Sequence, residues 1–434
     1  MQNCERNQIQ IKVSGVMGRL SLLAGVGARA GRQALPPVAP RGSASPLVAT
    51  ASVLAQPQRG NSSTVNEATF QTKPCKLHKL DSAPAEEGKC TRDQALRYYR
   101  LMQVVRRMET AAGNLYKEKQ IRGFCHLYSG QEAVAVGMHG AMKDEDAIIT
   151  SYRCHGWTYI MGATITQVLA ELTGRVSGNV YGKGGSMHMY SKNFYGGNGI
   201  VGAQIPLGAG IAFAQKYHKK DAFTMALYGD GAANQGQLFE AANIAKLWNL
   251  PVVFVCENNG FGMGTSVQRS SASTDFYTRG DYVPGIWVDG MDVIGVREAT
   301  AFARDYCTSG KGPLMMEMAT YRYSGHSMSD PGTSYRTREE IQEVRKSRDP
   351  ITGFKDKIIS AKLVTSDELK DIDKAVRKEV DEANAVATSD GMLPLDAVYT
   401  DIYDVDTPDQ LIRSARYDHW VKPKALSTKA LLNL

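Results

Sequence analysis

Two short apolar stretches joined by a helical pattern constrain the fold of this chain most strongly. The first, 223–228 (FTMALY), ends at 229–231 (GDG), and the second, 251–257 (PVVFVCE), ends at 258–259 (NN). Both are rich in strand-forming residues. Between them, 237–248 has apolar residues at helical spacing: Leu238, Ala241, Ala242, Ala245 and Trp248. A strand-helix-strand connection makes the two strands parallel, so the pattern predicts an α/β sheet with both strand ends on one edge.

The residues at these two strand ends have the chemistry of a magnesium diphosphate site. Mg²⁺ prefers oxygen ligands and is usually held by one or two carboxylates and by phosphate oxygens. Asp230 offers a carboxylate, Asn259 an amide oxygen and Phe261 a backbone carbonyl. Glycines on both sides of Asp230 and along 260–264 allow a bulky anion to approach the backbone. Either motif alone is most often ordinary turn chemistry, but together they predict a metal-diphosphate site at the ligand-binding edge of the sheet.

These motifs resemble those of a known family. GDGAANQG at 229–236 and ENNGFGMGTS at 257–266 are similar to the thiamine diphosphate motif of the two-oxoacid dehydrogenases. The resemblance runs from about Ala68 to the C-terminus and includes 106–127, 181–210 and 321–345. It is to the alpha subunits of the pyruvate dehydrogenase family, in their mitochondrial, somatic-type animal form. The branched-chain two-oxoacid dehydrogenase alpha subunits are the alternative.

The resemblance implies an open, mostly parallel α/β sheet with flanking helices, the thiamine diphosphate-binding fold of the diphosphate type. It implies thiamine diphosphate and Mg²⁺ as cofactors, with the metal held by Asp230, Asn259 and the Phe261 carbonyl. It places the cofactor-binding contacts at Tyr152, Arg153, Gly199, Val201, Asp230, Gly231, Ala232, Asn259, Phe261 and His326. His126 and His326 match the catalytic histidines of the active-site channel, where an imidazole bonds an anion or carries a proton.

Without the resemblance, several of these residues have an ordinary structural interpretation. The Tyr152-Arg153 pair would be assigned to a surface salt bridge, although the guanidinium fork suits phosphate oxygens. His126 and His326 would each be a satisfied core or surface histidine. His155 and His188 receive no role.

A serine-rich loop follows the last predicted strand. The resemblance implies that Ser327, Ser334 and Ser266 are phosphorylated by a dedicated kinase, which would switch the enzyme off by adding negative charge beside His326. This chain departs from the family pattern at Ser324, where a histidine is expected, which puts the order of the loop in question. Phe261 replaces a tyrosine, but its metal ligand is the backbone carbonyl.

The resemblance also implies an activity and its partners. The chain would be the alpha subunit in an α2β2 heterotetramer with a beta subunit that supplies the glutamate activating the cofactor. The assembly would decarboxylate pyruvate oxidatively and acetylate the lipoyl group of a dihydrolipoyl acetyltransferase core, linking glycolysis to acetyl-CoA. A kinase and a phosphatase would regulate it. No nucleic-acid partner and no membrane span are expected, since no run of eighteen apolar residues occurs.

The N-terminal segment reads as a mitochondrial transit peptide. Residues 1–60 contain seven Arg or Lys and the single acid Glu5, so they carry +6 of the total charge of +7. The composition is basic, rich in Ala and Ser and poor in acids; a basic arm that binds nucleic acid or lipid is the alternative. The seven scattered cysteines contain no CxxC pair and fit a reducing compartment such as the mitochondrial matrix.

Four segments are predicted along the chain: the leader at 1–60, an extension at 61–90, the cofactor-binding α/β domain at 91–335, and a helical extension at 336–434 that packs on this domain and on partner subunits. Capping boxes predict helix starts at Thr91 and Thr365.

Other enzyme classes fit less well. No GxGxxG motif follows a strand, which disfavours a nicotinamide oxidoreductase, and GNVYGKGG at 178–185 has the wrong spacing for a P-loop. A regulatory subunit with a silent site is disfavoured by the intact set of Asp230, Asn259, Arg153 and His126.

Overall fold

The computed structural model describes residues 64–402, 412–413, 420–421 and 426–433. The leader predicted at 1–60 lies outside these residues. The boundaries predicted at 90 and 335 stay predictions.

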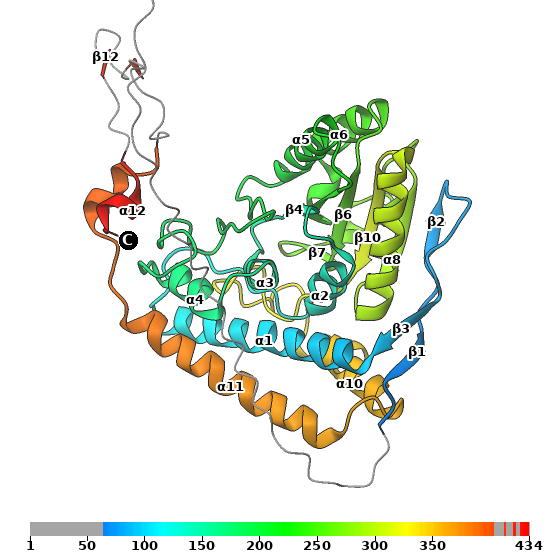
Figure 1. The fold of residues 1–434 in the computed structure, drawn as a ribbon, viewed down its shortest axis with the longest axis horizontal. Helices are drawn as coiled ribbons and strands as arrows, with labels where there is room; N and C mark the ends of the chain where they lie inside the picture. Colours follow the sequence, from blue (N-terminus) through cyan, green and yellow to red (C-terminus); the bar gives the residue numbers. More distant parts are fainter. Residues whose placement is uncertain (1–63, 403–411, 414–419, 422–425, 434) are drawn as a thin grey trace, which may run out of the picture. The chain divides into compact units, whose positions relative to one another are not determined.

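A six-stranded sheet forms the centre of the fold, in the order β2-β9-β10-β6-β5-β4 (Figure 1). Five neighbouring strands are parallel: β4 (Ala147–Ile149), β5 (Thr224–Gly229), β6 (Val252–Asn258), β9 (Gly285–Asp289) and β10 (Leu314–Ala319). The edge strand β2 (Lys76–His78) is antiparallel to β9. The prediction of an open, mostly parallel α/β sheet is therefore confirmed.

Both faces of the sheet are covered, which explains why the central strands read as continuous apolar runs. Alternate residues of β5 and β6 enter two separate cores: Leu227 and Val255 join one, and Ala226 and Phe254 join the other. The first core contains α1 (Arg92–Lys117), α2 (Glu132–Ala141) and α8 (Val293–Tyr306); the second contains α5 (Gln204–Tyr217) and α6 (Gly236–Leu247). Figure 1 shows α5 and α6 together, away from α1 and α2.

The predicted helix between the two motif strands is α6. Leu238, Ala241, Ala242 and Ala245 are buried as their spacing indicates. Trp248, at the C-cap, is 49% exposed, so it does not continue the buried face.

Two capping boxes predicted from the sequence are present. Thr91 begins α1 and Thr365 begins α11 (Ser366–Ser389), each with its side chain bonded to the third residue of the helix. The apolar face of α11 packs against α1 and α4 (Ile165–Thr173), as Figure 1 also shows for α1. The other α-helices of the described residues are α3 (His155–Ile160), α7 (Val267–Ser270), α9 (Arg338–Arg348), α10 (Pro350–Ser360) and α12 (Thr428–Leu431).

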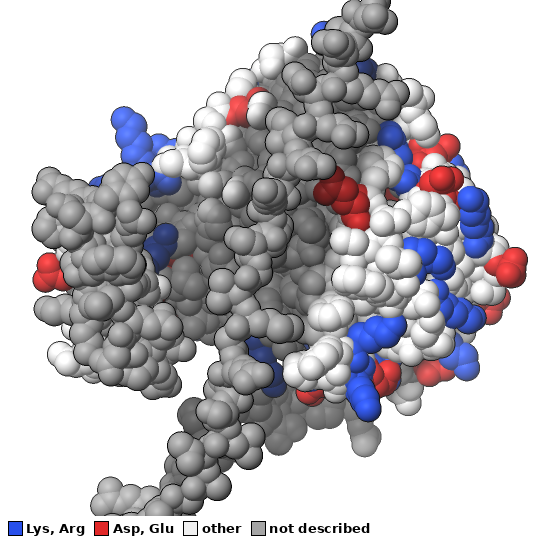
Figure 2. All heavy atoms as spheres, turned by 90° about the horizontal axis from the view of Figure 1, so that it is seen from above, with Lys and Arg blue, Asp and Glu red and all other residues white. Residues whose placement is uncertain are grey.

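Three two-stranded ladders lie outside the central sheet. They pair β1 (Glu67–Gln71) with β3 (Glu87–Thr91), β7 (Phe261–Gly262) with β8 (Thr265–Ser266), and β11 (Ile412–Arg413) with β12 (Trp420–Val421). Acidic and basic side chains are interspersed over the coloured part of the face in Figure 2, in line with the small net charge outside the leader. Within the described residues, no helix is both long and apolar enough to cross a membrane.

The contact between α2 and α8 depends on a glycine. A Cβ on Gly137 would lie 2.7 Å from the Val293 carbonyl oxygen and 2.7 Å from Val296 Cβ. We expect Gly137→Ala to lower the free energy of unfolding by about 1–3 kcal/mol, because the backbone of α8 would have to move. Gly353 in α10 has no heavy atom within 4 Å of its Cβ position and serves as the control. Gly353→Ala should raise the value by about 0.5–1 kcal/mol. Urea unfolding measures both, and equal stability of Gly137→Ala and the parent would refute the close contact.

Candidate active site

The carboxyl ends of β5 and β6 lie side by side in the sheet. Their register pairs Gly229 with Glu257, so Asp230 and Asn259 follow the two strands at the same edge. Asp230 is 2% exposed and Asn259 is 7% exposed. The structure thus brings together the two polar side chains on which the metal prediction rests.

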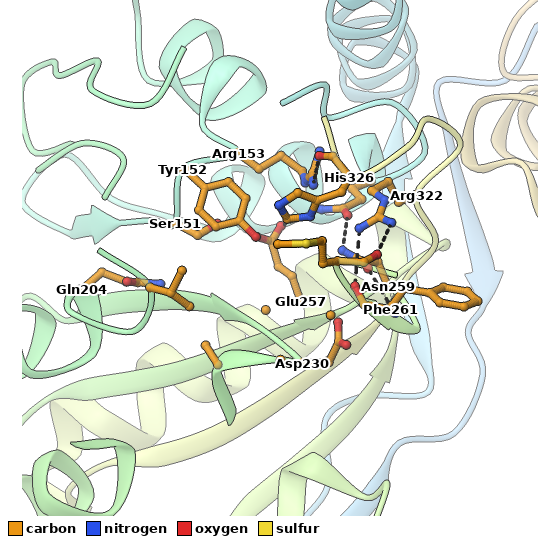
Figure 3. A pocket seen from close by; sticks show the side chains of 17 residues that line it. Ser151, Tyr152, Arg153, Gln204, Asp230, Glu257, Asn259, Phe261, Arg322 and His326 are labelled. Atoms are coloured by element: carbon orange, nitrogen blue, oxygen red, sulfur yellow. Dashed lines mark hydrogen bonds between the residues drawn. The ribbon is translucent and has the colours of Figure 1, made fainter. Parts of the chain in front are cut away.

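A cavity of about 250 Å³ opens at this edge. Figure 3 shows Tyr152, Arg153 and His326 on one side of it and Asp230 on the opposite side. The lining combines residues from both strand ends with residues from distant loops: Gln131, Ser151, Tyr152, Arg153, Val201, Gln204, Gly229, Asp230, Gly231, Ala232, Glu257, Asn259, Phe261, Gly262, Met263, Arg322 and His326.

The Asp230 carboxylate fits a divalent cation. Its Oδ2 atom is buried and has no hydrogen-bond partner among the described residues. A buried charge without a partner is costly, and a bound cation would remove that cost. Next to it, a Cβ on Gly231 would lie 3.2 Å from Gly262 Cα, so side chains at these two positions would crowd the two loops.

The other two predicted metal ligands retain free coordination capacity. Asn259 Oδ1 accepts only a long bond, of 3.4 Å, from the Phe261 N–H, while its amide nitrogen donates to Gln131 Oε1 at 3.1 Å. The Phe261 carbonyl accepts a similarly long bond, of 3.4 Å, from Arg322 Nη1. Since a carbonyl oxygen has two lone pairs, both oxygens remain able to bind a cation.

Burial shifts the protonation of the two carboxyl groups at this edge. It raises the pKa of Asp230 from 3.8 to about 6, although the backbone N–H groups of Asp230 and Asn259 oppose the rise. It raises the pKa of Glu257 from 4.5 to about 7, against hydrogen bonds to its charged form that include one from the Tyr128 hydroxyl at 2.5 Å. Both groups therefore titrate near neutral pH, which is typical of functional sites.

Three aromatic rings from separate loops form a cluster: Tyr152 and His326 line the cavity, and His126, which does not line it, packs against both. The centroid of the His126 ring lies 4.5 Å from that of Tyr152 and 5.3 Å from that of His326, and Tyr152 and His326 are 5.5 Å apart. The Nδ1 atoms of both histidines are buried without a partner among the described residues. The two histidines predicted to be catalytic thus meet in space, 200 residues apart in sequence.

Arg153 links the two histidine segments through their backbones. Its Nη1 donates to the Leu127 carbonyl at 2.6 Å and its Nη2 to the His326 carbonyl at 2.9 Å. Arg153 lines the cavity, but these bonds hold loops together rather than leaving the whole guanidinium free for a phosphate. Burial, followed by the charge of Arg153, lowers the pKa of His126 far below its usual range and that of His326 to about 4. Both imidazoles are therefore neutral at pH 7.

Of the four remaining predicted cofactor contacts, three line the cavity and one does not. Gly231, Ala232 and Val201 line the cavity, whereas Gly199 does not. A Cβ on Gly199 would instead lie 3.2 Å from the His188 ring.

Five polar residues that the sequence analysis did not select also line the cavity: Gln131, Ser151, Gln204, Glu257 and Arg322. Glu257 lies in the motif strand and Arg322 directly precedes the serine-rich loop, so their positions beside known motifs were the available signal. Gln131 and Gln204 stand at the starts of α2 and α5, and no sequence pattern distinguishes them from ordinary helix-terminal residues.

The serine-rich loop after β10 is fixed by one acid and two arginines. Asp330 accepts from the His326 N–H and from the Tyr335 hydroxyl, each at 2.6 Å. The backbone carbonyl of Ser324 accepts from Arg322 and Arg336. Because this anchor uses the backbone, the replacement of the expected histidine by Ser324 leaves these bonds in place.

The three serines predicted to be phosphorylated differ in accessibility. Ser327 is 6% exposed, with its Oγ 2.8 Å from Ser329 Oγ. Ser334 is exposed, and Ser266 is partly buried at the N-cap of α7. In this conformation Ser334 is therefore the most accessible of the three and Ser327 the least.

Residues 100–396 match the family model described as the dehydrogenase E1 component. The chain belongs to the dehydrogenase E1 component family. This family uses thiamine diphosphate, in agreement with the cofactor expected from the motifs. The chain is 73% identical over 355 residues to the probable pyruvate dehydrogenase E1 component subunit alpha, mitochondrial, of Caenorhabditis elegans; the match covers 82% of this chain and 89% of that protein.

Two further relatives of this E1 chain extend the similarity. The pyruvate dehydrogenase E1 component subunit alpha type II, mitochondrial, of Ascaris suum is 69% identical, with 81% of this chain and 90% of the relative covered. The pyruvate dehydrogenase E1 component subunit alpha, somatic form, mitochondrial, of Homo sapiens is 58% identical, with 83% and 92% covered.

Replacing Asp230 by asparagine tests the metal assignment. Burial raises the pKa of Asp230 from 3.8 to about 6. Ionisation of this carboxyl group therefore lowers the stability of the cofactor-free fold as the pH rises from about 4 to 6. We expect Asp230→Asn to stabilise the cofactor-free protein above pH 6 by up to roughly 3 kcal/mol, while sharply weakening Mg²⁺-dependent thiamine diphosphate binding, since the amide that replaces the carboxylate carries no charge.

Calorimetric titration between pH 5 and 8 supplies the second half of this test. In the parent protein, cofactor affinity should fall about tenfold per pH unit below pH 6, since a protonated carboxyl is a poor metal ligand. Undiminished cofactor affinity in Asp230→Asn would refute the assignment.

Proposed function

We propose that the chain is the alpha subunit of mitochondrial pyruvate dehydrogenase, which catalyses thiamine diphosphate-dependent oxidative decarboxylation of pyruvate. The observation that carries the proposal is the buried, unpartnered carboxylate oxygen of Asp230 at the joined ends of β5 and β6, in a chain of the E1 family. The relatives named above are pyruvate dehydrogenase alpha subunits. Their names support pyruvate over a branched-chain oxoacid, and the somatic type stays a prediction.

In this proposal the cation is Mg²⁺, which Asp230, Asn259 and the carbonyl of Phe261 would hold. Gly231 and Ala232 line the adjoining part of the cavity and leave space for the diphosphate. When bound, thiamine diphosphate supplies the nucleophilic carbon and the electron sink for decarboxylation. The protein contributes position and a dry, polar environment around the reacting groups.

The aromatic cluster would act on the substrate. His126 and His326 are neutral at pH 7, so each has one donor and one acceptor nitrogen to offer, and both Nδ1 atoms are unpartnered among the described residues. The Tyr152 ring packs against both histidines and lines the cavity, where it limits the space for water. We assign to the histidines the orientation of the pyruvate carboxylate and proton exchange with its oxo group, and to Tyr152 and Arg153 contacts with the diphosphate.

The outer surface of α5 and α6 has the apolar character of a contact with a partner subunit. Several large apolar side chains there are 41–71% exposed: Leu207, Phe213, Phe239, Ile244, Leu247 and Trp248. An apolar surface of this kind marks a protein contact. We propose that a beta subunit covers it in an α2β2 heterotetramer and supplies the glutamate that activates the cofactor. The acetyl product would pass to the lipoyl group of the dihydrolipoyl acetyltransferase core.

Regulation and location complete the proposal. Phosphorylation of Ser327, Ser334 and Ser266 by a dedicated kinase, reversed by a phosphatase, would switch the enzyme off. The relatives carry the word mitochondrial in their names, which supports the matrix as the location and a transit-peptide role for residues 1–60.

Substrate choice tests the proposed activity. The chain, coexpressed with its beta subunit, should oxidise pyruvate with a lipoyl-domain acceptor at least about a hundredfold more efficiently than branched-chain two-oxoacids, as judged by kcat/KM. Preference for the branched-chain substrates would replace the proposal by its alternative. Absence of a copurifying beta subunit would contradict the heterotetramer.

A glutamate at Ser327 tests the switch. The site is buried, so a carboxylate there lacks a partner and should displace the loop that carries His326. We expect Ser327→Glu to lower kcat by at least about tenfold, whereas Thr333→Glu, at an exposed position in the same loop, should change it less than about twofold. Steady-state assays of the reconstituted enzyme decide this, and full activity of Ser327→Glu would count against the switch.

A further inference from the structure

Outside the cavity lining, three buried polar side chains form a continuous hydrogen-bonded chain. Oε2 of Glu109, in α1, lies 2.9 Å from Nδ1 of His155, the first residue of α3. His155 Nε2 lies 2.8 Å from Ser186 Oγ. Glu109 and His155 are fully buried and Ser186 is 6% exposed. None of the three lines the cavity, and the motifs assign them no role.

The direction of these bonds follows from what each group can donate. A carboxylate only accepts, so His155 Nδ1 carries the proton and Nε2 accepts from the Ser186 hydroxyl. Ser186 Oγ then accepts the backbone N–H of His126 at 3.1 Å. At the other end, Glu109 Oε1 accepts the backbone N–H of Tyr128 at 2.8 Å. This single tautomer satisfies every group in the chain.

Both ends of the chain therefore bond the segment that carries His126. Residues 120–131 form neither helix nor strand, so this segment lacks the backbone ladder that would otherwise fix it. The carbonyl between the two bonded N–H groups, that of Leu127, accepts from Arg153 Nη1 at 2.6 Å. Three consecutive residues of an irregular segment are thus held by buried side chains.

Ser186 is itself anchored from the opposite direction. The carboxylate of Glu171 in α4 accepts four backbone N–H groups from the glycine-rich loop that precedes Ser186: those of Val180, Gly182, Gly184 and Gly185. This loop cannot move without breaking charge-assisted bonds. Ser186 is therefore a fixed point against which His126 is held.

We propose that Glu109, His155 and Ser186 form a positioning relay that sets the place of His126 in the active site. The arrangement of carboxylate, imidazole and hydroxyl is that of a nucleophilic triad, but burial and the occupied Oγ exclude attack on a substrate. Ser186 and His155 are positioning residues, since they act only through His126. The inference rests on the role given to His126 under the proposed function.

A double-mutant cycle in the α2β2 holoenzyme tests the relay. Ser186→Ala should lower kcat for pyruvate by about tenfold, because a displaced imidazole no longer meets the substrate, and should leave the affinity for Mg²⁺-thiamine diphosphate within about twofold. In a His126→Ala background the same change should lower kcat by less than about twofold, since residues acting as a unit are not additive. Thr158→Val, which removes another buried hydroxyl from α3, is the control and should retain the parent kcat.

Glu109→Gln provides a second variant of nearly unchanged shape if Ser186→Ala does not assemble. Its amide cannot accept at both oxygen positions, so it should also lower kcat in the parent but not in the His126→Ala background. An unchanged kcat in a folded relay variant would overturn the relay. An equal loss of kcat in the parent and in the His126→Ala background would also overturn it, because the relay residues would then have a purely structural role. If His126→Ala itself retains the parent kcat, the role assigned to His126 under the proposed function fails instead.

Discussion

The rest of the site depends on the burial of the Asp230 carboxylate. Parallel pairing of β5 and β6 places it at a sheet edge covered by loops, where desolvation raises its pKa to about 6 and one oxygen has no partner among the described residues. Such a group is costly in isolation and favourable beside a cation. Gly231 and Gly262 approach each other closely beside Asp230, and larger residues at these positions would crowd the two loops at the same sheet edge.

The active-site histidines are held in place by hydrogen bonds from buried side chains to their backbone segments. Both come from irregular segments, which no sheet or helix fixes, and buried side chains supply the missing backbone partners. Arg153 joins the carbonyls of Leu127 and His326, and the chain through Ser186 holds the N–H of His126. The reactive groups therefore lie on loops whose backbones are fixed by buried side chains of other segments, two of which, Glu109 and His155, belong to helices.

Local signals predicted a large part of the fold. The apolar runs of β5 and β6, and the capping boxes at Thr91 and Thr365, lie where the sequence placed them, because short-range chemistry determines strand and helix starts. The cavity was predicted less completely. Glu257 meets Tyr128 across 129 residues and Asn259 meets Gln131 across 128, and no local pattern encodes such encounters.

The sequence by itself determined the strand-helix-strand unit that became β5, α6 and β6, the helix starts at Thr91 and Thr365, and the motif that assigns the chain to the E1 family. Only the tertiary structure decided the electrostatics and the supporting contacts. His155 received no role from sequence, yet it is fully buried between Glu109 and Ser186. The neutral state of His126 at pH 7 likewise follows from burial and from the charge of Arg153. Desolvation depends on every neighbour in three dimensions, and those neighbours come from segments far apart along the chain.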